Sequence, residues 1–96
     1  EMNVWNYNTT SVNFTSFEVR VDGQLVDVTA KELAVLKLLV EHQGQVLSRS
    51  QILDHVWAAH EDPPFDRVVD VYIKQLRKKL LLDCIVTVKN VGYKLE

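Results

Sequence analysis

The sequence predicts an α+β domain with strands at both ends of the chain and three helices in the middle. Apolar residues alternate with period two over the first 28 residues, then recur at helical spacing over residues 29–82. A second alternation near the C-terminus is interrupted by Lys89-Asn90-Val91-Gly92, a composition typical of a hairpin turn. We therefore expect the order ββββ-α-α-α-ββ.

The N-terminal strands are expected around residues 3–7, 12–14, 17–21 and 25–28. Asn8-Thr9-Thr10 and Asp22-Gly23 have the residue types of tight turns, which predicts an antiparallel sheet. Four short strands cannot bury two faces by themselves, so one face should rest on the helices.

The first two helices begin with capping boxes, in which Thr29 precedes Glu32 and Ser48 precedes Gln51 by three residues. Gly44 is expected to end the first helix as a C-cap glycine. Pro63-Pro64 then interrupts the helical pattern. The apolar stripes of these helices are Leu33, Leu36, Leu39 and Val40, then Ile52, Leu53, Val56 and Trp57.

The third helix, expected from about Phe65 to Leu82, is amphipathic. At about 100° per residue, Ile73, Leu76 and Leu80 fall within about 40° of Val69 and form a buried stripe. No acidic residue occurs between Val71 and Leu82. Asp70 and Lys74 have the i,i+4 spacing of an ion pair. The opposite face carries Arg67, Val71, Lys74 and Lys78, with Gln75 on one flank and Asp70 and Arg77 on the other.

Charge is distributed unevenly along this chain of net charge −2. Residues 1–64 contain four basic and nine acidic residues, whereas residues 65–96 contain seven basic and four acidic residues. The asymmetry favours one face that meets a polyanion, and the alternative is a basic face that is only solvated. Cations bind phosphates, while the Gln75 amide and the Val71 methyl groups suit base edges. Two short helices before a longer basic one are typical of a helix-turn-helix.

Six segments in order along the chain carry a family resemblance. They read TAKEL at 29–33, VLSRSQIL at 46–53, VW at 56–57, RVVDVYI at 67–73, LRKKL at 76–80 and TVKNVGYKL at 87–95. Together they resemble the winged helix-turn-helix effector domain of OmpR/PhoB-type response regulators. The resemblance implies one domain over residues 1–96, with its N-terminal sheet in 1–28, its helices in 29–82 and its wing in 83–96.

The resemblance also implies a function and a set of contact residues. It implies sequence-specific binding of double-stranded DNA and transcription control in a bacterial two-component system. The helix at about 65–82 would lie in the major groove, and the wing at 87–94 on the backbone or in the minor groove. The implied recognition-helix contacts are Arg67, Val71, Lys74, Gln75, Arg77 and Lys78. The implied phosphate and wing contacts are Arg49, Trp57, Thr87, Lys89, Asn90, Tyr93 and Lys94.

Some of these positions have a second interpretation. Trp57 lies on an apolar stripe and Tyr93 can pack under the hairpin, so both are also core candidates. The segment 58–65 matches the loop that relatives present to RNA polymerase, and otherwise it is a plain solvated connection. Its polar residues are His60, Glu61 and Asp62.

The sequence departs from the family pattern in four places. Lys89-Asn90 stands where relatives commonly have Arg-Gly, and Asn90 is expected to adopt a left-handed conformation. Gln75 replaces a frequent cation, and Tyr72 stands where histidine is common. The connection over residues 81–86 is shorter than usual and lacks Gly and Pro. The wing is therefore expected to sit closer to the third helix.

The implied partners are a receiver domain outside this chain and its sensor kinase. RNA polymerase is a further candidate partner. The isolated domain is expected to be a monomer that binds direct-repeat half-sites in tandem. A start at Glu1 instead of Met fits a piece of a longer protein. Cys84 is the only cysteine, so no internal disulfide is expected, and a reducing, cytoplasmic location fits. No apolar run reaches the roughly 18 residues of a membrane span.

Two other classes of function compete with DNA binding. Catalysis is disfavoured, because His42, His55 and His60 have no nucleophile or metal-ligand spacing beside them. Three glycines form no phosphate-binding loop, and no cofactor or metal is expected. The stronger alternative is a protein-interaction module of winged-helix fold whose DNA binding is weak or lost.

Overall fold

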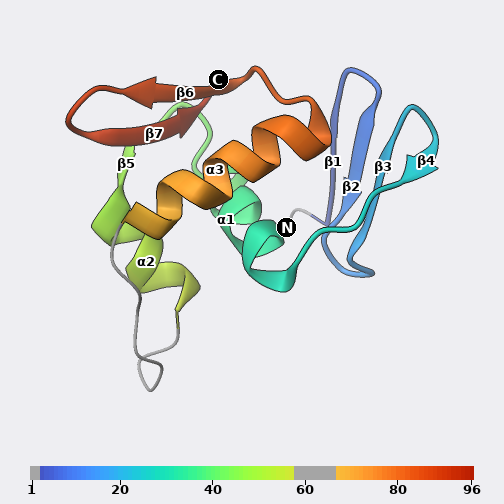
Figure 1. The fold of residues 1–96 in the computed structure, drawn as a ribbon, viewed down its shortest axis with the longest axis horizontal. Coiled ribbons are helices and arrows are strands. Elements are labelled where there is room, and N and C mark those ends of the chain that lie inside the picture. Colours follow the sequence, from blue (N-terminus) through green and yellow to red (C-terminus); the bar gives the residue numbers. More distant parts are fainter. Residues whose placement is uncertain (1–2, 58–66) are drawn as a thin grey trace.

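The computed structural model describes residues 3–57 and 67–96, and it confirms the predicted α+β class. A four-stranded antiparallel sheet lies at one end, the helices lie in the centre, and a three-stranded sheet carries the C-terminal hairpin (Figure 1). The elements are β1 (Val4–Tyr7), β2 (Thr10–Asn13), β3 (Glu18–Val21), β4 (Gln24–Leu25), α1 (Ala30–Glu41), β5 (Leu47–Ser48), α2 (Arg49–Val56), α3 (Arg67–Leu80), β6 (Ile85–Val88) and β7 (Gly92–Leu95).

The N-terminal sheet has the order β1-β2-β3-β4 and two tight hairpins. Asp22 and Gly23 both have positive φ, 53° and 81°, which is the geometry that a two-residue hairpin turn favours. The first turn contains only Asn8 and Thr9, since Thr10 already pairs with Tyr7 in the ladder. The prediction that placed Thr10 in the turn is therefore wrong by one residue.

Two further strand predictions need correction. Phe17 is outside β3, with φ 58° and an exposed fraction of 61%. The Asn13 side-chain oxygen accepts from the backbone N–H groups of Thr15 and Ser16, so the chain turns before it reaches Phe17. The fourth strand is only two residues long, Gln24–Leu25, although Val26 still donates to the carbonyl of Val19 at 2.9 Å in the same register.

Both predicted capping boxes are present. The Thr29 hydroxyl accepts from the Glu32 N–H at 3.1 Å while the Glu32 carboxylate accepts from the Thr29 N–H at 2.8 Å. Ser48 and Gln51 make the same reciprocal pair at 3.1 and 2.8 Å. The end of α1 differs from the prediction, because His42 is the C-cap residue. Gly44 lies two residues further on with φ 87° and donates to the carbonyl of Leu95.

The third helix ends at Leu80, two residues earlier than predicted, and residues 65 and 66 lie outside the described residues. Leu81 adopts a left-handed φ of 55°, and the Leu82 N–H donates to the carbonyl of Arg77 at 3.2 Å. This is a Schellman ending with leucine in the position that usually holds glycine. Leu81 is exposed and Leu82 is buried, so the left-handed turn at Leu81 is followed at once by a leucine packed in the core.

The C-terminal sheet contains a strand that the sequence analysis did not predict. Its order is β5-β7-β6, and β5 pairs Leu47 with Tyr93 and Ser48 with Gly92. A Cβ atom on Gly92 would lie 1.9 Å from the carbonyl oxygen of Leu47. Gly92 is therefore required for the close approach of β5 and not for the turn. Asn90, with φ 64°, does adopt the predicted left-handed conformation.

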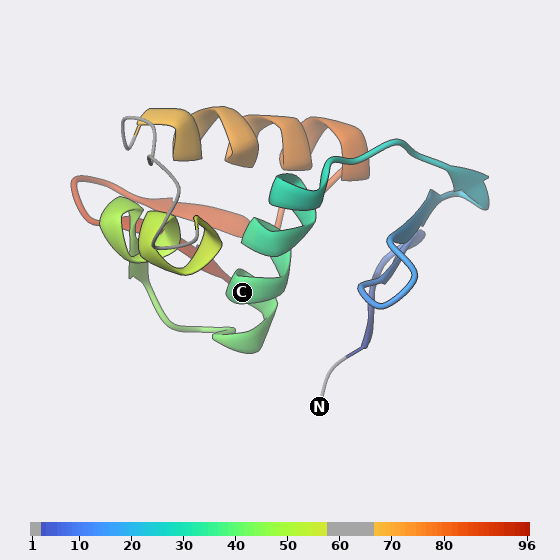
Figure 2. The same cartoon turned by 90° about the horizontal axis from the view of Figure 1, so that it is seen from below.

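The helices supply most of the core, residues from both sheets such as Val12, Val19, Ile85 and Leu95 complete it, and α3 lies across α1 (Figure 2). The N-terminal sheet lies beside the C-terminal end of α3, where the buried Thr10 hydroxyl donates to the carbonyl of Leu80 at 2.7 Å. The Tyr7 hydroxyl donates to the Asp83 carboxylate nearby. Among the described residues, no helix has the length and apolar character needed to cross a membrane.

Candidate nucleic-acid interface

The exposed face of α3 is the one that its sequence predicts. Val69, Ile73, Leu76 and Leu80 are at most 1% exposed and form the inner stripe. The outward side chains Arg67, Val71, Lys74 and Lys78 are all exposed. Val71 is 54% exposed, so an aliphatic side chain lies at the surface among these cations. Gln75 is half-buried on the flank of this face.

Asp70 pairs across the domain and not along its own helix. Its Oδ1 atom accepts from Arg49 Nε at 2.9 Å and also from the Tyr93 hydroxyl. The predicted partner Lys74 makes no ion pair within residues 3–57 and 67–96. The tertiary pairing therefore leaves the Lys74 ammonium facing solvent on the outer face of α3.

Arg77 and Thr87, both predicted to contact DNA, also contact each other. Arg77 Nη2 donates to the carbonyl of Ile85 at 2.7 Å and to the Thr87 hydroxyl at 2.9 Å. These bonds hold α3 against β6 at the base of the wing. The guanidinium of Arg77 also lies 5.8 Å from the centre of the Tyr93 ring.

Tyr93 lies beneath the wing, where it is 5% exposed. The Arg49 guanidinium is 5.6 Å from its ring centre. The Tyr93 ring therefore makes cation–π contacts with two arginines, Arg49 on α2 and Arg77 on α3. Its alternative role in the core is therefore confirmed, while its predicted contact with DNA stays a prediction.

The four residues Arg49, Asp70, Arg77 and Tyr93 are called here the arginine–tyrosine cluster, and three of them, Arg49, Asp70 and Tyr93, shift one another's protonation equilibria. Burial acts to raise the pKa of Asp70, but the hydrogen bonds from Tyr93 and Arg49 outweigh it and the pKa is lowered. The hydrogen bond to Asp70 raises the pKa of Arg49. Burial, followed by the bond to Asp70, raises the pKa of Tyr93. The cluster is thus an ionised aspartate held between a cation and a neutral phenol.

Trp57 is half-buried at the C-terminal cap of α2. Its ring centre lies 5.7 Å from that of Tyr72 and 5.0 Å from Lys31 Nζ. Tyr72 on α3 therefore packs against Trp57. The exposed part of Trp57 stays a predicted phosphate contact.

The tip of the wing is exposed at Lys89, Asn90 and Val91. Val91 is 51% exposed, and its N–H donates to the carbonyl of Val88 at 2.9 Å to close the turn. Lys94 is on the second strand of the wing and pairs with Glu96 at 3.2 Å. In Figure 1 the wing tip lies at the same end of the domain as the start of α3.

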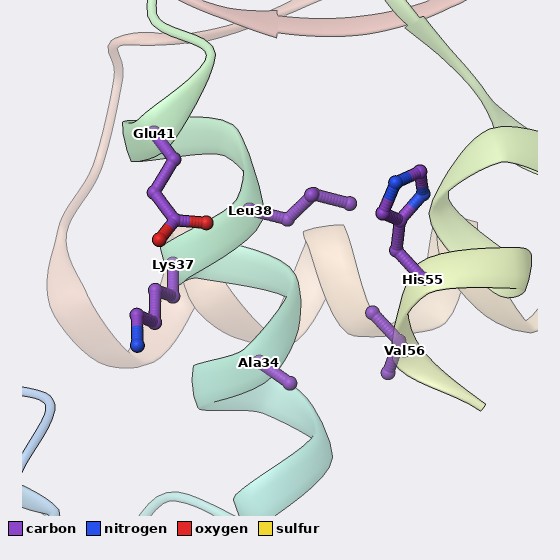
Figure 3. A pocket seen from close by; sticks show the side chains of 6 residues that line it. All are labelled: Ala34, Lys37, Leu38, Glu41, His55 and Val56. Carbon is purple, nitrogen blue, oxygen red and sulfur yellow. The ribbon is translucent and has the colours of Figure 1, made fainter. Parts of the chain in front are cut away.

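A shallow hollow of about 260 Å³ lies between α1 and α2 (Figure 3). Lys37, Glu41 and His55 line it together with aliphatic residues, and His55 Nδ1 contacts the carbonyl of Gln51 at 2.8 Å. The described residues contain no group of three or more side chains arranged to bind a metal. Cys84 is buried, and burial raises the pKa of its thiol. The predicted polymerase-contacting residues His60, Glu61 and Asp62 lie outside the described residues.

Comparison with known proteins assigns this chain to a family. The family model described as "Transcriptional regulatory protein, C terminal" matches residues 23–95. This chain belongs to that family. The prediction of an OmpR/PhoB-type effector domain with a winged-helix fold is thereby confirmed.

Individual relatives agree with the family assignment. Response regulator RR06 of Streptococcus pneumoniae is 55% identical over 93 residues, covering 97% of this chain and 43% of the relative. The structure of DrrB, an OmpR/PhoB homologue from Thermotoga maritima, matches with a TM-score of 0.84 at 30% identity, covering 99% of this chain and 45% of DrrB. The DNA-binding domain of Klebsiella pneumoniae RstA, solved in complex with the RstA box, matches with a TM-score of 0.73 at 28% identity, covering 98% of this chain and 97% of that domain. The chain spans less than half the length of the curated relatives it matches.

Two structural pairings at this site escaped the sequence analysis. Glu32 was assigned only to its capping box, yet it is buried and its carboxylate also accepts from Lys79 Nζ at 3.0 Å. The sequence analysis paired Asp70 with Lys74, whereas in the structure Asp70 pairs with Arg49. In both cases the partner lies on another helix, and the only available signal was an acidic residue close to an apolar stripe.

Proposed function

We infer that this domain binds double-stranded DNA sequence-specifically and controls transcription, with α3 in the major groove and the wing on the backbone or in the minor groove. The observation that carries the inference is the outer face of α3, which combines three exposed cations with the exposed Val71. Cations supply affinity for phosphates, and an aliphatic side chain beside them suits a thymine methyl group. The family to which the chain belongs supports the same function.

A titration of the domain against a random duplex at several salt concentrations tests this inference. A handful of phosphate contacts predicts a slope of roughly −3 to −6 for log K against log salt. Absence of binding at low salt would favour the alternative, an interaction module of the same fold without DNA binding.

Two substitutions divide the face of α3 into its roles. Lys74→Ala should weaken binding to every duplex and make the salt slope shallower by about one unit, because one phosphate contact is lost. Gln75→Ala should instead change the preference among sites. A selection of bound sequences from a random duplex pool supplies the specific site for this comparison. If both substitutions weaken specific and random binding equally, the assigned roles are wrong.

The wider context of the domain is part of the same proposal. The matched relatives are response regulators more than twice as long as this chain, which supports a receiver domain and a sensor kinase acting on the complete protein in the cytoplasm. We propose that two domains bind direct-repeat half-sites in tandem and that the segment 58–65 contacts RNA polymerase. Sedimentation with a one-site and a two-site duplex tests the tandem arrangement, since only the longer duplex should take up two copies.

A further inference from the structure

An acidic residue lies on the flank of the surface that we propose to face DNA. Asp70 lies on α3 three residues after Arg67 and four before Lys74, and its side chain is 40% exposed. A carboxylate so close to phosphates should oppose binding through charge repulsion. The contacts that Asp70 makes indicate why the domain carries one there.

The Asp70 carboxylate connects three separate elements. Oδ1 accepts from Arg49 Nε at the start of α2 and from the Tyr93 hydroxyl on β7. Arg49 directly follows β5, which itself pairs with β7. The one oxygen atom therefore joins the second helix, the third helix and the wing.

The bond geometry leaves Arg49 able to contact a phosphate. Asp70 engages Nε and does not occupy the two terminal nitrogens, so the guanidinium keeps N–H donors there for another acceptor. The arginine side chain is 34% exposed and lies over the Tyr93 ring. A long side chain fixed at its Nε atom and by an aromatic ring loses less rotamer freedom when it binds a ligand.

We propose that Asp70 is a positioning residue for DNA binding, which holds Arg49 and the Tyr93-bearing wing in one fixed arrangement toward the phosphate backbone. This inference rests on the proposed DNA interface. Asp70 touches no phosphate in this arrangement, and it acts through the guanidinium of Arg49. Arg77, bonded to Ile85 and Thr87, lies 5.8 Å from the centre of the same ring.

The proposal predicts a change in DNA affinity opposite in sign to the one expected from charge alone. Replacing an ordinary exposed aspartate by asparagine removes a negative charge and should leave DNA affinity unchanged or raise it. Asp70→Asn should instead weaken binding by about 5- to 20-fold, the effect expected when one charge-assisted hydrogen bond to phosphate is lost. Asp22→Asn is the matched control, because Asp22 is exposed in the β3–β4 turn with a positive φ that asparagine tolerates.

A double-mutant cycle separates positioning from a structural role. In the Arg49→Ala background Asp70 has no arginine to hold, so Asp70→Asn should then strengthen binding. Affinity is measured on one duplex at fixed salt, and each variant is first shown to be folded by its thermal melt. Weakening by Asp70→Asn in both backgrounds, or strengthening in both, would overturn the proposal.

A second measurement needs no substitution. Pairing of Arg49 Nε–H with Asp70 should slow its exchange with water, so its resonance should persist at neutral pH in the NMR spectrum of the free domain. Rapid exchange at Arg49 would contradict a fixed guanidinium. Failure of the DNA interface itself is recognised separately, because Lys74→Ala would then leave binding unchanged.

Discussion

The two sheets of this domain are built on different principles. The N-terminal sheet joins consecutive strands, and two-residue turns set the register of two of its three hairpins. The C-terminal sheet depends on β5, whose Leu47 pairs with Tyr93 after both α2 and α3 have intervened. Local pairing is specified by turn residues, whereas the distant pairing requires the whole helical core to bring its strands together.

The sheets are also attached to α3 by different chemistry. Neutral hydroxyls of the N-terminal sheet, on Thr10 and Tyr7, donate to groups at the end of α3 and just beyond it. The C-terminal sheet is attached through arginines, Asp70 and Tyr93. We infer that the first attachment serves stability alone, while the second also fixes cations that face DNA. The predictions that follow test this contrast.

The largest effect is expected from Gly92→Ala in the C-terminal sheet. The added Cβ would lie 1.9 Å from the Leu47 carbonyl oxygen, so β5 and β7 must separate. We expect the free energy of unfolding to fall by about 3 kcal/mol or more, as for other severe steric clashes. Urea denaturation measures the loss.

Gly23→Ala in the N-terminal sheet is the control for this steric effect. A Cβ on Gly23 meets no atom within 4 Å, but φ is 81°. Only the conformational cost applies, and it should be about 1 kcal/mol. Equal losses for the two glycines would refute the distinction between a steric and a conformational glycine.

Thr10→Val tests the attachment of the N-terminal sheet. The variant keeps the shape of the side chain but removes the hydroxyl that donates to Leu80 at 2.7 Å, so a helix-end carbonyl loses its partner. Unfolding should become easier by about 1–2 kcal/mol, with DNA affinity unchanged. Thr9→Val, at an exposed neighbouring position, should have little effect. A loss of DNA affinity with Thr10→Val would contradict a purely structural role for this sheet.

Leu81→Gly tests the connection between α3 and the wing. Leu81 is 60% exposed and has a φ of 55°, so glycine relieves strain without the loss of much apolar burial. The domain should become more stable by about 0.5–1 kcal/mol. Leu81→Ala retains the Cβ atom and should not show this gain. If alanine stabilises the domain as much as glycine, the left-handed conformation is not the cause.

The smallest effects concern the pH dependence of stability. Acid should weaken the contribution of Asp70 at the C-terminal sheet, whereas alkali should weaken that of Tyr7 at the N-terminal sheet. The lowered pKa of Asp70 means that its contribution is present above the ordinary value of 3.8 and is lost as the pH falls below it. The hydrogen bond to Asp83 raises the pKa of Tyr7 to about 12, so its contribution is present below pH 10.0 and is lost as the pH rises toward 12.

Stability curves of Asp70→Asn and Tyr7→Phe against pH measure both effects. The difference between Asp70→Asn and the parent domain should shrink in acid, and that between Tyr7→Phe and the parent should shrink in alkali. A difference that stays constant across its window would contradict the assigned ionisation.

Much of the fold was predictable because its signals are local. The capping boxes at Thr29 and Ser48, the Asp22-Gly23 turn and the stripe through Val69 all involve residues close together in the sequence, and the structure contains each of them. The predicted ends of elements were wrong where a short-range turn interrupts the periodic pattern. Leu81 ends α3 although it is not glycine, and the turn at Asn13 excludes Phe17 from β3.

The sequence alone determined which face of α3 is buried and which side chains it turns outward, because helical periodicity assigns both from spacing. Only the tertiary structure decided the partners of those side chains. Asp70 meets Arg49 and Tyr93, and Glu32 meets Lys79, because packing brings together residues that are far apart in the chain. A charge can pair with any opposite charge within reach, so its partner is fixed by packing and not by periodicity.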